Sequence, residues 1–204
     1  MFESKELPVI ALNYNTIEKT MATITTANIN TGGATIYIGG TVSTADGDGY
    51  YIGTTGGTEV GATTGGCTVN YTFETSDIFC DQVMSPIDVA ITSETASIEF
   101  EMLETSAANL QLALSQTVST ADSSNSKIGV GGVRNVVYSP IKLTIPDTQS
   151  GLLTTWTFFR CKAGAFSTAF NRDTPTTVKC TFTAYADTSH VSGHQLFSVN
   201  QALV

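Results

Sequence analysis

Two histidines lie at a spacing that could hold zinc. His190 and His194 are four residues apart, which would place two imidazoles on one face of a helix. The stretch that contains them, Asp187–His194, is polar and turn-like and has no helical stripe of apolar residues. We therefore expect a solvated loop here and no metal site.

Clustered carboxylates form two further candidates. Asp46-Gly47-Asp48-Gly49 brings two acids together, as hard cations such as calcium prefer, but it lacks the spacing of a calcium loop. Tight turns use the same residues. Glu99 and Glu101 share one face of a predicted strand and could form a glycosidase-like acid pair. A solvated strand face is the commoner explanation of such a pair.

Motifs for nucleophilic or cofactor chemistry are missing from the sequence. It contains no G-x-S-x-G elbow, no Walker A loop and no G-x-G-x-x-G fingerprint. Cysteines 67, 80, 161 and 180 form neither a C-x-x-C pair nor a zinc-like spacing. We expect no enzyme activity, no cofactor and no metal. The first residues show no signal peptide and no apolar run is long enough to span a bilayer, so we expect cytosolic synthesis, reduced thiols and no membrane partner.

The distribution of charge is the strongest physical signal. The 204 residues carry 18 acids and 9 bases, a net charge of −9, which argues against binding to nucleic acid or anionic membranes. Between Lys19 and Lys127 there are twelve acids and no base. This segment serves either solubility or a surface that repels phosphate, and both explanations remain open.

The elements that must position these residues are mainly β-strands. Only 13% of residues are charged, while 34 are threonine, a β-branched residue that suits a pleated surface. Twelve of the 18 glycines lie between Thr31 and Gly66. That region reads as short strands with tight turns, or as a long loop that orders only against a partner.

Alternating apolar and polar residues predict the longer strands. One strand has Cys67, Val69, Tyr71 and Phe73 on one face, and a later one has Ala96, Ile98, Phe100 and Met102 facing inward. Val89 and Ile91 have the opposite parity, so a bulge or turn must lie between them and Ala96. Four further strands are predicted at 128–138, 141–145, 152–162 and 176–185, and a last apolar piece at 196–199.

One segment predicts a helix, at about residues 105–116. Thr105 or Ser106 would cap it, and Ala107, Leu110 and Leu114 form its apolar stripe. A polar linker, 119–126, follows. The fold class is thus mainly β, a sandwich or barrel with one flanking helix, in a single domain over 1–204 with a Gly/Thr-rich insertion or arm at about 31–66.

Several of these segments resemble the tail tube (major tail) proteins of long-tailed bacteriophages. The resembling segments are Tyr50–Thr55, Val69–Glu74, Asp81-Gln82, Ser85–Glu104, Val178–Asp187, Gly193 and Leu196-Phe197. Together they cover about half of the chain, and none contains a catalytic motif. The stretches 31–49 and 119–127 match nothing in that pattern.

The resemblance implies a structural protein that forms hexameric rings stacked into a hollow tube. Strands of neighbouring subunits would join into an inner β-barrel, and DNA would pass through without specific binding. The partners implied are further copies, a tape measure protein, a terminator and a distal tail protein, and the location is the virion after assembly in the host cytoplasm.

A tube lined by lysine and arginine would bind the phosphate backbone of DNA and retain it, whereas an acidic lining would not. We therefore predict that Glu74, Glu99 and Glu101, which share the polar face of two resembling strands, line the lumen. Two alternatives remain. One is another β-rich virion component, such as a terminator, distal tail or capsid decoration protein. The other is a carbohydrate-binding β-sandwich that uses Tyr37, Tyr50 and Tyr51 as a stacking platform.

Overall fold

The computed structural model describes residues 33–42, 54–115, 119–122, 125–128, 130, 137–146, 152–170 and 172–203. The larger strands are β1 (Thr35–Ile38), β5 (Thr63–Cys80), β6 (Val83–Met102), β9 (Ser139–Pro146), β10 (Leu152–Ala169), β11 (Thr177–Ala184) and β12 (Phe197–Leu203). The short strands are β2 (Thr41–Val42), β3 (Thr54–Thr55), β4 (Thr58–Glu59), β7 (Ser119–Asp122) and β8 (Asn125–Lys127). The one helix described is α1 (Ala107–Ala113).

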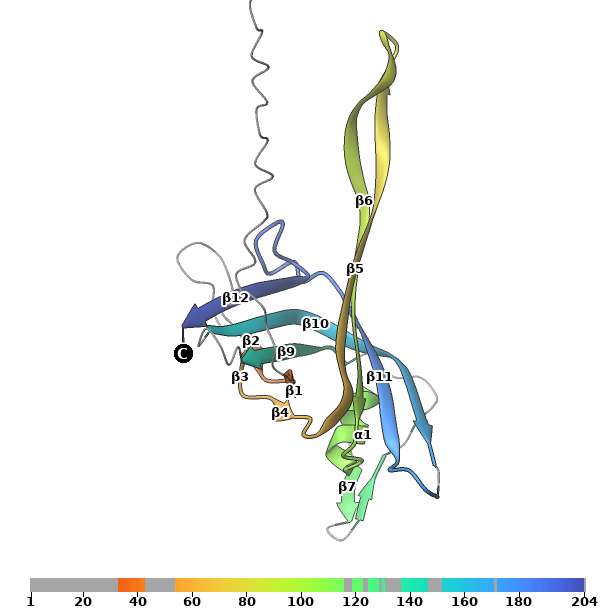
Figure 1. The fold of residues 1–204 in the computed structure, drawn as a ribbon, viewed down its shortest axis with the longest axis vertical. Helices are drawn as coiled ribbons and strands as arrows, with labels where there is room; N and C mark the ends of the chain where they lie inside the picture. Colours follow the sequence, from red (N-terminus) through yellow and green to blue (C-terminus); the bar gives the residue numbers. More distant parts are fainter. Residues whose placement is uncertain are drawn as a thin grey trace, which may run out of the picture.

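One bent antiparallel sheet contains most of these strands, in the order β4-β1-β9-β10-β11-β6-β5, with β12 on β10 (Figure 1). Strand β10 connects its two halves. Residues 152–158 pair with β12 and β9, whereas residues 161–169 pair with β11. The predicted mainly-β class with one helix is confirmed, and the sheet is open rather than a closed barrel.

The core lies where the two halves of the sheet meet. Its largest fully buried side chains include Ile36, Ile141, Phe158 and Phe182, which come from four strands. The inward set predicted on β6, Ala96 to Met102, is confirmed, with each member 3% exposed or less. On β5 the prediction holds only in part: Cys67 and Val69 pack against the core, whereas Tyr71 and Phe73 lie beyond it.

The helix is shorter than predicted and has a different inner face. Ser106 is its N-cap, and its side chain accepts a hydrogen bond of 3.2 Å from the backbone N–H of Asn109. The fully buried residues are Asn109 and Ala113. Of the predicted stripe, Leu110 packs against the core as a partly buried side chain, whereas Ala107 and Leu114 do not belong to the core cluster. Asn109 is buried because its amide donates to the carbonyls of Val60 and Glu104, each at 2.9 Å, which docks the helix. No helix in the described residues is long and apolar enough to cross a membrane.

Other predicted elements have mixed outcomes. The strands predicted at 141–145, 152–162 and 176–185 are present as β9, β10 and β11, although β10 continues to Ala169. The linker predicted at 119–126 contains the β7–β8 ribbon instead. The Gly/Thr-rich region contains, in its described part, β1 and the two-residue strands β2, β3 and β4. Its Asp46–Gly49 turn, and most of the strand predicted at 128–138, lie outside the described residues.

Candidate assembly surface

The β5–β6 hairpin is far longer than the body of the protein can cover. Its inner part packs in the core, and the outer part, residues 71–95, projects alone beyond the body (Figure 1). We call residues 71–95 the hairpin extension. Within the described residues its two strands pair only with each other, so both outer edges present unpaired backbone groups.

A bulge at Thr92 determines which side chains share a face of the hairpin extension. Glu74 pairs with Ser93 and Thr75 pairs with Ile91, so Thr92 has no partner across the ladder. Its hydroxyl instead donates to the carbonyl of Glu74 at 3.2 Å. The bulge predicted from the parity change is therefore present, and it puts Val89 and Ile91 on the same face as the core residues of β6.

This face carries an apolar stripe outside the core. The stripe consists of Tyr71, Phe73, Val89 and Ile91, whose exposed fractions lie between 43% and 58%. Tyr71 and Phe73 are in ring contact, with centroids 6.1 Å apart. Because the four follow directly from Cys67 and Val69, the stripe continues the core face beyond the body.

The opposite face of the hairpin is polar and rich in hydroxyls. Thr72 and Thr95 share a hydrogen bond of 2.7 Å, and Ser93 donates to the carboxylate of Glu74 at 3.3 Å. These contacts hold the face together without a lysine or arginine. Hydroxyls remain hydrated at such a surface, which leaves the apolar stripe as the face that gains most from being covered.

The three glutamates predicted to line a lumen all lie on this polar face. Glu74 is exposed on the hairpin extension, whereas Glu99 and Glu101 are half-buried on the body. The fold brings two lysines from other parts of the sequence onto this face. Lys179 of β11 pairs with Glu101 of β6, and Lys162 of β10 pairs with Thr183 of β11. The nearly pure negative field expected of residues 20–126 thus belongs to the extension and not to the body.

A glycine pair shapes the same face beside Glu99 and Glu101. β5 contains two extra residues, Gly65 and Gly66, between its pairs with Glu101 and Phe100. Both have positive φ, 72° and 79°, a conformation that side-chain-bearing residues rarely adopt. The resulting bulge opens a shallow hollow between the two carboxylates and Lys179.

A cleft lies where the hairpin extension leaves the body. Tyr71, Ile91 and Glu94 line its hairpin side, and Tyr185 and Phe197 line its body side. The Tyr71 hydroxyl donates to Glu94 at 2.9 Å, and this bond raises the pKa of Tyr71. The apolar stripe therefore runs from this cleft outward.

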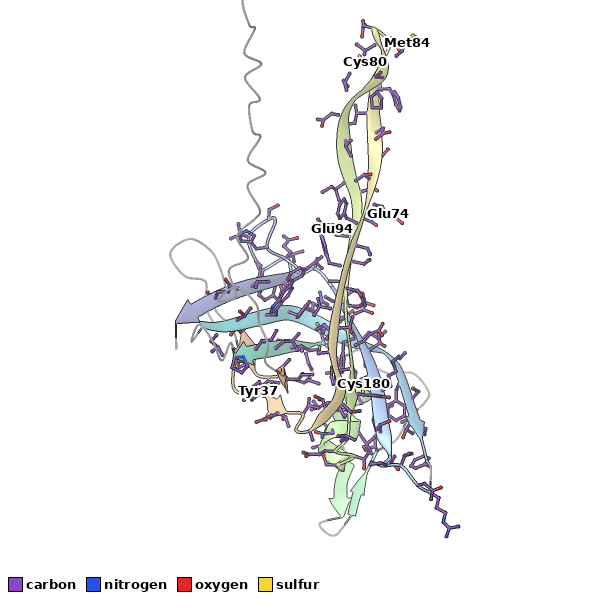
Figure 2. The ribbon with its side chains drawn as sticks, viewed as in Figure 1. Tyr37, Glu74, Cys80, Met84, Glu94 and Cys180 are labelled. Atoms are coloured by element: carbon purple, nitrogen blue, oxygen red, sulfur yellow. The ribbon has the colours of Figure 1, made fainter. Side chains whose placement is uncertain are left out.

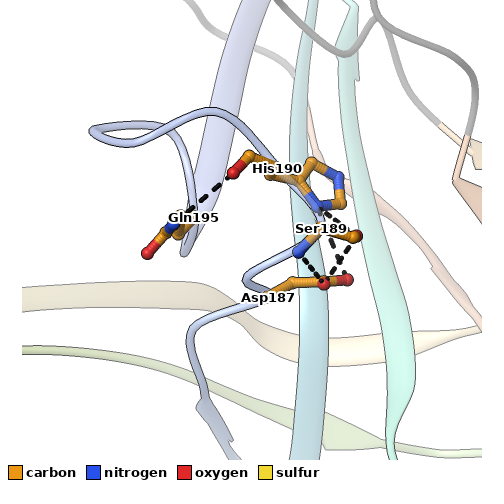
Figure 3. Close-up of polar contacts among 4 residues, drawn as sticks. All are labelled: Asp187, Ser189, His190 and Gln195. Carbon is orange, nitrogen blue, oxygen red and sulfur yellow. Dashed lines mark hydrogen bonds and ion pairs between the residues drawn. The ribbon is translucent and has the colours of Figure 1, made fainter.

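The loop that contains both histidines, residues 185–196, contributes to the body side of the cleft. Figure 3 shows the polar contacts within this loop. Asp187 accepts from the Ser189 hydroxyl at 2.7 Å and from its backbone N–H at 3.0 Å, and these bonds lower the pKa of Asp187. His190 is buried, stacks on Phe159 at 4.0 Å, and lies 3.5 Å from the Asp187 carboxylate. His194 lies in a separate turn with no helix between them. This cluster fixes the path of the chain into β12.

The cysteines and tyrosines singled out in the sequence form no site of their own. The four thiols are free, and burial raises the pKa of Cys67 to about 11 and of Cys161 and Cys180 to about 12. The Lys142 ammonium covers the Tyr37 ring at 4.4 Å, so that ring is not an open platform. Tyr50 and Tyr51 lie outside the described residues. No group of three or more potential metal ligands occurs in the described part of the chain.

Half of the sheet has two open edges. Within the described residues β5 pairs only with β6, and residues 162–169 of β10 pair only with β11. Among the described residues, the four-stranded half β5-β6-β11-β10 therefore has no further strand on either side. At the β10 edge, the N–H of Ala163 donates to the Ser115 hydroxyl at 3.0 Å. One face of this half is the polar one. Unpaired edges at both ends of a sheet allow copies to join side by side.

Sequence reasoning located the strands and missed the hairpin extension. The signal was present: two alternating segments of 18 and 20 residues flank a two-residue turn. At roughly 3.3 Å per residue such strands span about 60 Å, which exceeds what the body of a 200-residue domain covers.

Comparisons with known proteins do not assign a family. No family model matches the chain, and no curated protein matches it. Nineteen chains of solved structures match, among them the crystal structure of Hcp1 from Salmonella typhimurium. That match is 9% identical, covers 83% of this chain and 93% of that one, and has a TM-score of 0.30. At this level the likeness carries no argument about function.

Proposed function

We propose that the protein is a structural subunit that assembles with copies of itself, as a tail tube protein of a long-tailed bacteriophage does. In this proposal the subunits form hexameric rings that stack into a hollow conduit for DNA, within a virion assembled in the host cytoplasm. The observation that carries it is the apolar stripe, a continuation of the core face that the described body covers only at its inner end, where the Tyr71 ring contacts Phe197 with centroids 5.7 Å apart.

The energetics of the hairpin extension favour a covered state. A two-stranded hairpin is marginally stable in water on its own. Fully burying a large apolar side chain contributes about 1.5–3 kcal/mol, and the four side chains of the stripe are about half exposed, so covering each of them contributes about 1 kcal/mol. A second copy that packs on the stripe supplies the apolar packing partner that the hairpin lacks.

The open edges of the four-stranded half-sheet support ring closure. If β5 of one copy pairs with the free edge of β10 in the next, the sheets join into one barrel and both sets of backbone groups are satisfied. The polar face then becomes one wall of the assembly, with Glu74, Glu99 and Glu101 as the predicted lumen residues. Lys162 and Lys179 on the same face make that wall close to neutral and rich in hydroxyls, which still avoids tight binding of phosphate.

Negative-stain electron microscopy and sedimentation velocity over a concentration series test this proposal. The wild-type protein is expected to form rings or hollow tubes of uniform diameter. Ile91→Ser in the stripe is expected to raise the concentration required for assembly by about tenfold or more, which corresponds to a loss of at least ~1.4 kcal/mol. Val191→Ser, an exposed valine in the loop before β12, is the matched control and should assemble as the wild type does. Wild-type protein that remains monomeric at every concentration would overturn the proposal.

A further inference from the structure

The tip of the hairpin extension, residues 77–88, presents apolar side chains at the far end of the molecule. Phe79, Val83 and Met84 are all exposed, and Met84 is fully so. Figure 2 places Met84 and Cys80 at the end of the hairpin, remote from every other described element. Large apolar side chains gathered at one exposed point mark a contact surface.

The tip is also negatively charged. Asp77, Asp81 and Asp88 accompany the apolar side chains, and residues 77–88 contain no lysine or arginine. Within the described residues the one ion pair found joins Asp187 and His190. The tip carboxylates thus have no cationic partner in the part of the chain that the structure describes.

The turn between β10 and β11 has the complementary character. We call residues 166–170 and 172–179 the β10–β11 end. Phe170 there is 81% exposed, and Phe166 is also exposed. Arg172 is an exposed base next to Asp173, whereas Lys179 pairs with Glu101 in the sheet register. Aromatic and arginine side chains of this kind are the residues that most often anchor protein interfaces.

These two surfaces lie at opposite ends of the molecule. In Figure 1 the hairpin extension points upward from the body, and the turn between β10 and β11 points downward. A tip cannot reach the β10–β11 end of its own chain, but it can reach that of a second copy. The apolar and acidic tip then meets a partner that offers exposed aromatic rings and the Arg172 guanidinium, so the two surfaces match in apolar character and in charge.

We propose that the tip of one copy docks on the β10–β11 end of a second copy, in a head-to-tail contact. This inference rests on the proposed self-assembly and adds a contact distinct from the apolar stripe. Because the two surfaces differ, each docked pair leaves one tip and one β10–β11 end free. The contact can therefore repeat and extend the assembly in one direction, as stacking requires.

Two complementary variants test the direction of this contact. The end variant carries Phe170→Ser and Arg172→Glu, and the tip variant carries Phe79→Ser and Met84→Ser. All four positions are exposed, so thermal melts should match the wild type. By sedimentation, each variant alone should stop at a smaller assembly than the wild type. A mixture of the two should form a finite species of twice that size, because one intact tip meets one intact end.

The outcomes separate this inference from the proposed function. An end variant that assembles as far as the wild type, which a tip-to-tip contact would allow, overturns the docking and leaves self-assembly standing. Wild-type protein that never assembles overturns both. Combining Arg172→Glu with Asp81→Arg in one chain should restore at least part of the assembly lost in Arg172→Glu alone, and a further loss contradicts the charge pairing.

The free Cys80 thiol reports on the same contact without any substitution at the surface. Its alkylation rate should fall about tenfold or more when the wild-type protein assembles, since the docked end covers the tip. In the end variant at the same concentration the rate should stay at its monomer value. An equal fall in both proteins would contradict the assigned partner surface.

Discussion

The inner and outer parts of the β5–β6 hairpin have the same residue pattern and opposite surroundings. In the inner part, Ile98 and Phe100 are buried in the core. In the hairpin extension, Val89 and Ile91 occupy the same face and are more than half exposed. The bulge at Thr92 preserves this continuity of face across a change of parity.

The difference shows that alternation of apolar and polar residues specifies which face of a strand is apolar, but not what packs against that face. The hydrophobic effect depends on apolar area removed from water, and it does not distinguish cover from the same chain from cover by another. For the inner part the cover is β11 and the rest of the body. For the hairpin extension we infer that it is a second copy. Substitutions in the two parts should therefore affect different equilibria.

The largest effect on stability is expected in the inner part. Phe182→Ala removes a buried ring that stacks on Phe100 with centroids 5.7 Å apart. Deleting a core phenylalanine costs about 3–5 kcal/mol in the free energy of unfolding. Urea denaturation of the monomer measures it, and a loss under about 1 kcal/mol would mean that this core is not packed as described.

Deletion of Ala90 should separate the two parts. Without Ala90, Val89 directly precedes Ile91, so Val89 and the residues before it move to the opposite face of the hairpin extension. The free energy of unfolding should change by about 1 kcal/mol or less, because the core residues keep their places. Assembly should need severalfold more protein, because the stripe loses the aliphatic contact of Val89. Ala90→Ser, which keeps the residue count, is the control and should assemble normally.

Phe73→Ala is the counterpart of Phe182→Ala on the hairpin extension. Phe73 is 56% exposed, so its loss should change the unfolding free energy of the monomer by about 0.5 kcal/mol or less. Sedimentation should nevertheless show weaker assembly. A large loss of monomer stability with unchanged assembly would reverse the assignment of the two parts.

The smallest effect is expected at the loop that holds β12. The pKa of Asp187 lies below its ordinary value of 3.8, chiefly because of the Ser189 hydrogen bond. A lowered pKa contributes stability that is full above the ordinary value and is lost as the pH falls through the folded value. Asp187→Asn should therefore cost a few tenths of a kcal/mol at neutral pH, since the group is largely solvated, and the difference from wild type should shrink below pH 3.8. A difference that grows on acidification would contradict this.

Much of the body could be predicted from the sequence because its signals are local. Alternation located β6 and β11, Ser106 was one of two expected caps, and the parity change required the bulge. The burial of Asn109 on the inner face of the helix could not be predicted. Its amide donates to the carbonyl of Val60, which is distant in the sequence, and to that of Glu104, just before the helix. Composition favoured an apolar stripe of leucines there.

The candidate site was only partly predictable for a related reason. The sequence shows that Glu74, Glu99 and Glu101 share a face, which the register bears out, and whether they line a lumen stays a prediction. It does not show that Lys162 and Lys179 join that face, because strand neighbours depend on sheet order. It also does not show where the body ends along a regular hairpin.

Hydrogen–deuterium exchange of the hairpin extension tests the central claim most directly. Backbone amides of residues 71–80 and 83–95 are compared between dilute monomer and concentrated protein, with residues 180–184 of β11 as the internal reference. If a second copy covers the extension, its amides should become strongly protected at high concentration while those of β11 stay unchanged. Equal exchange of the extension at every concentration would contradict the account.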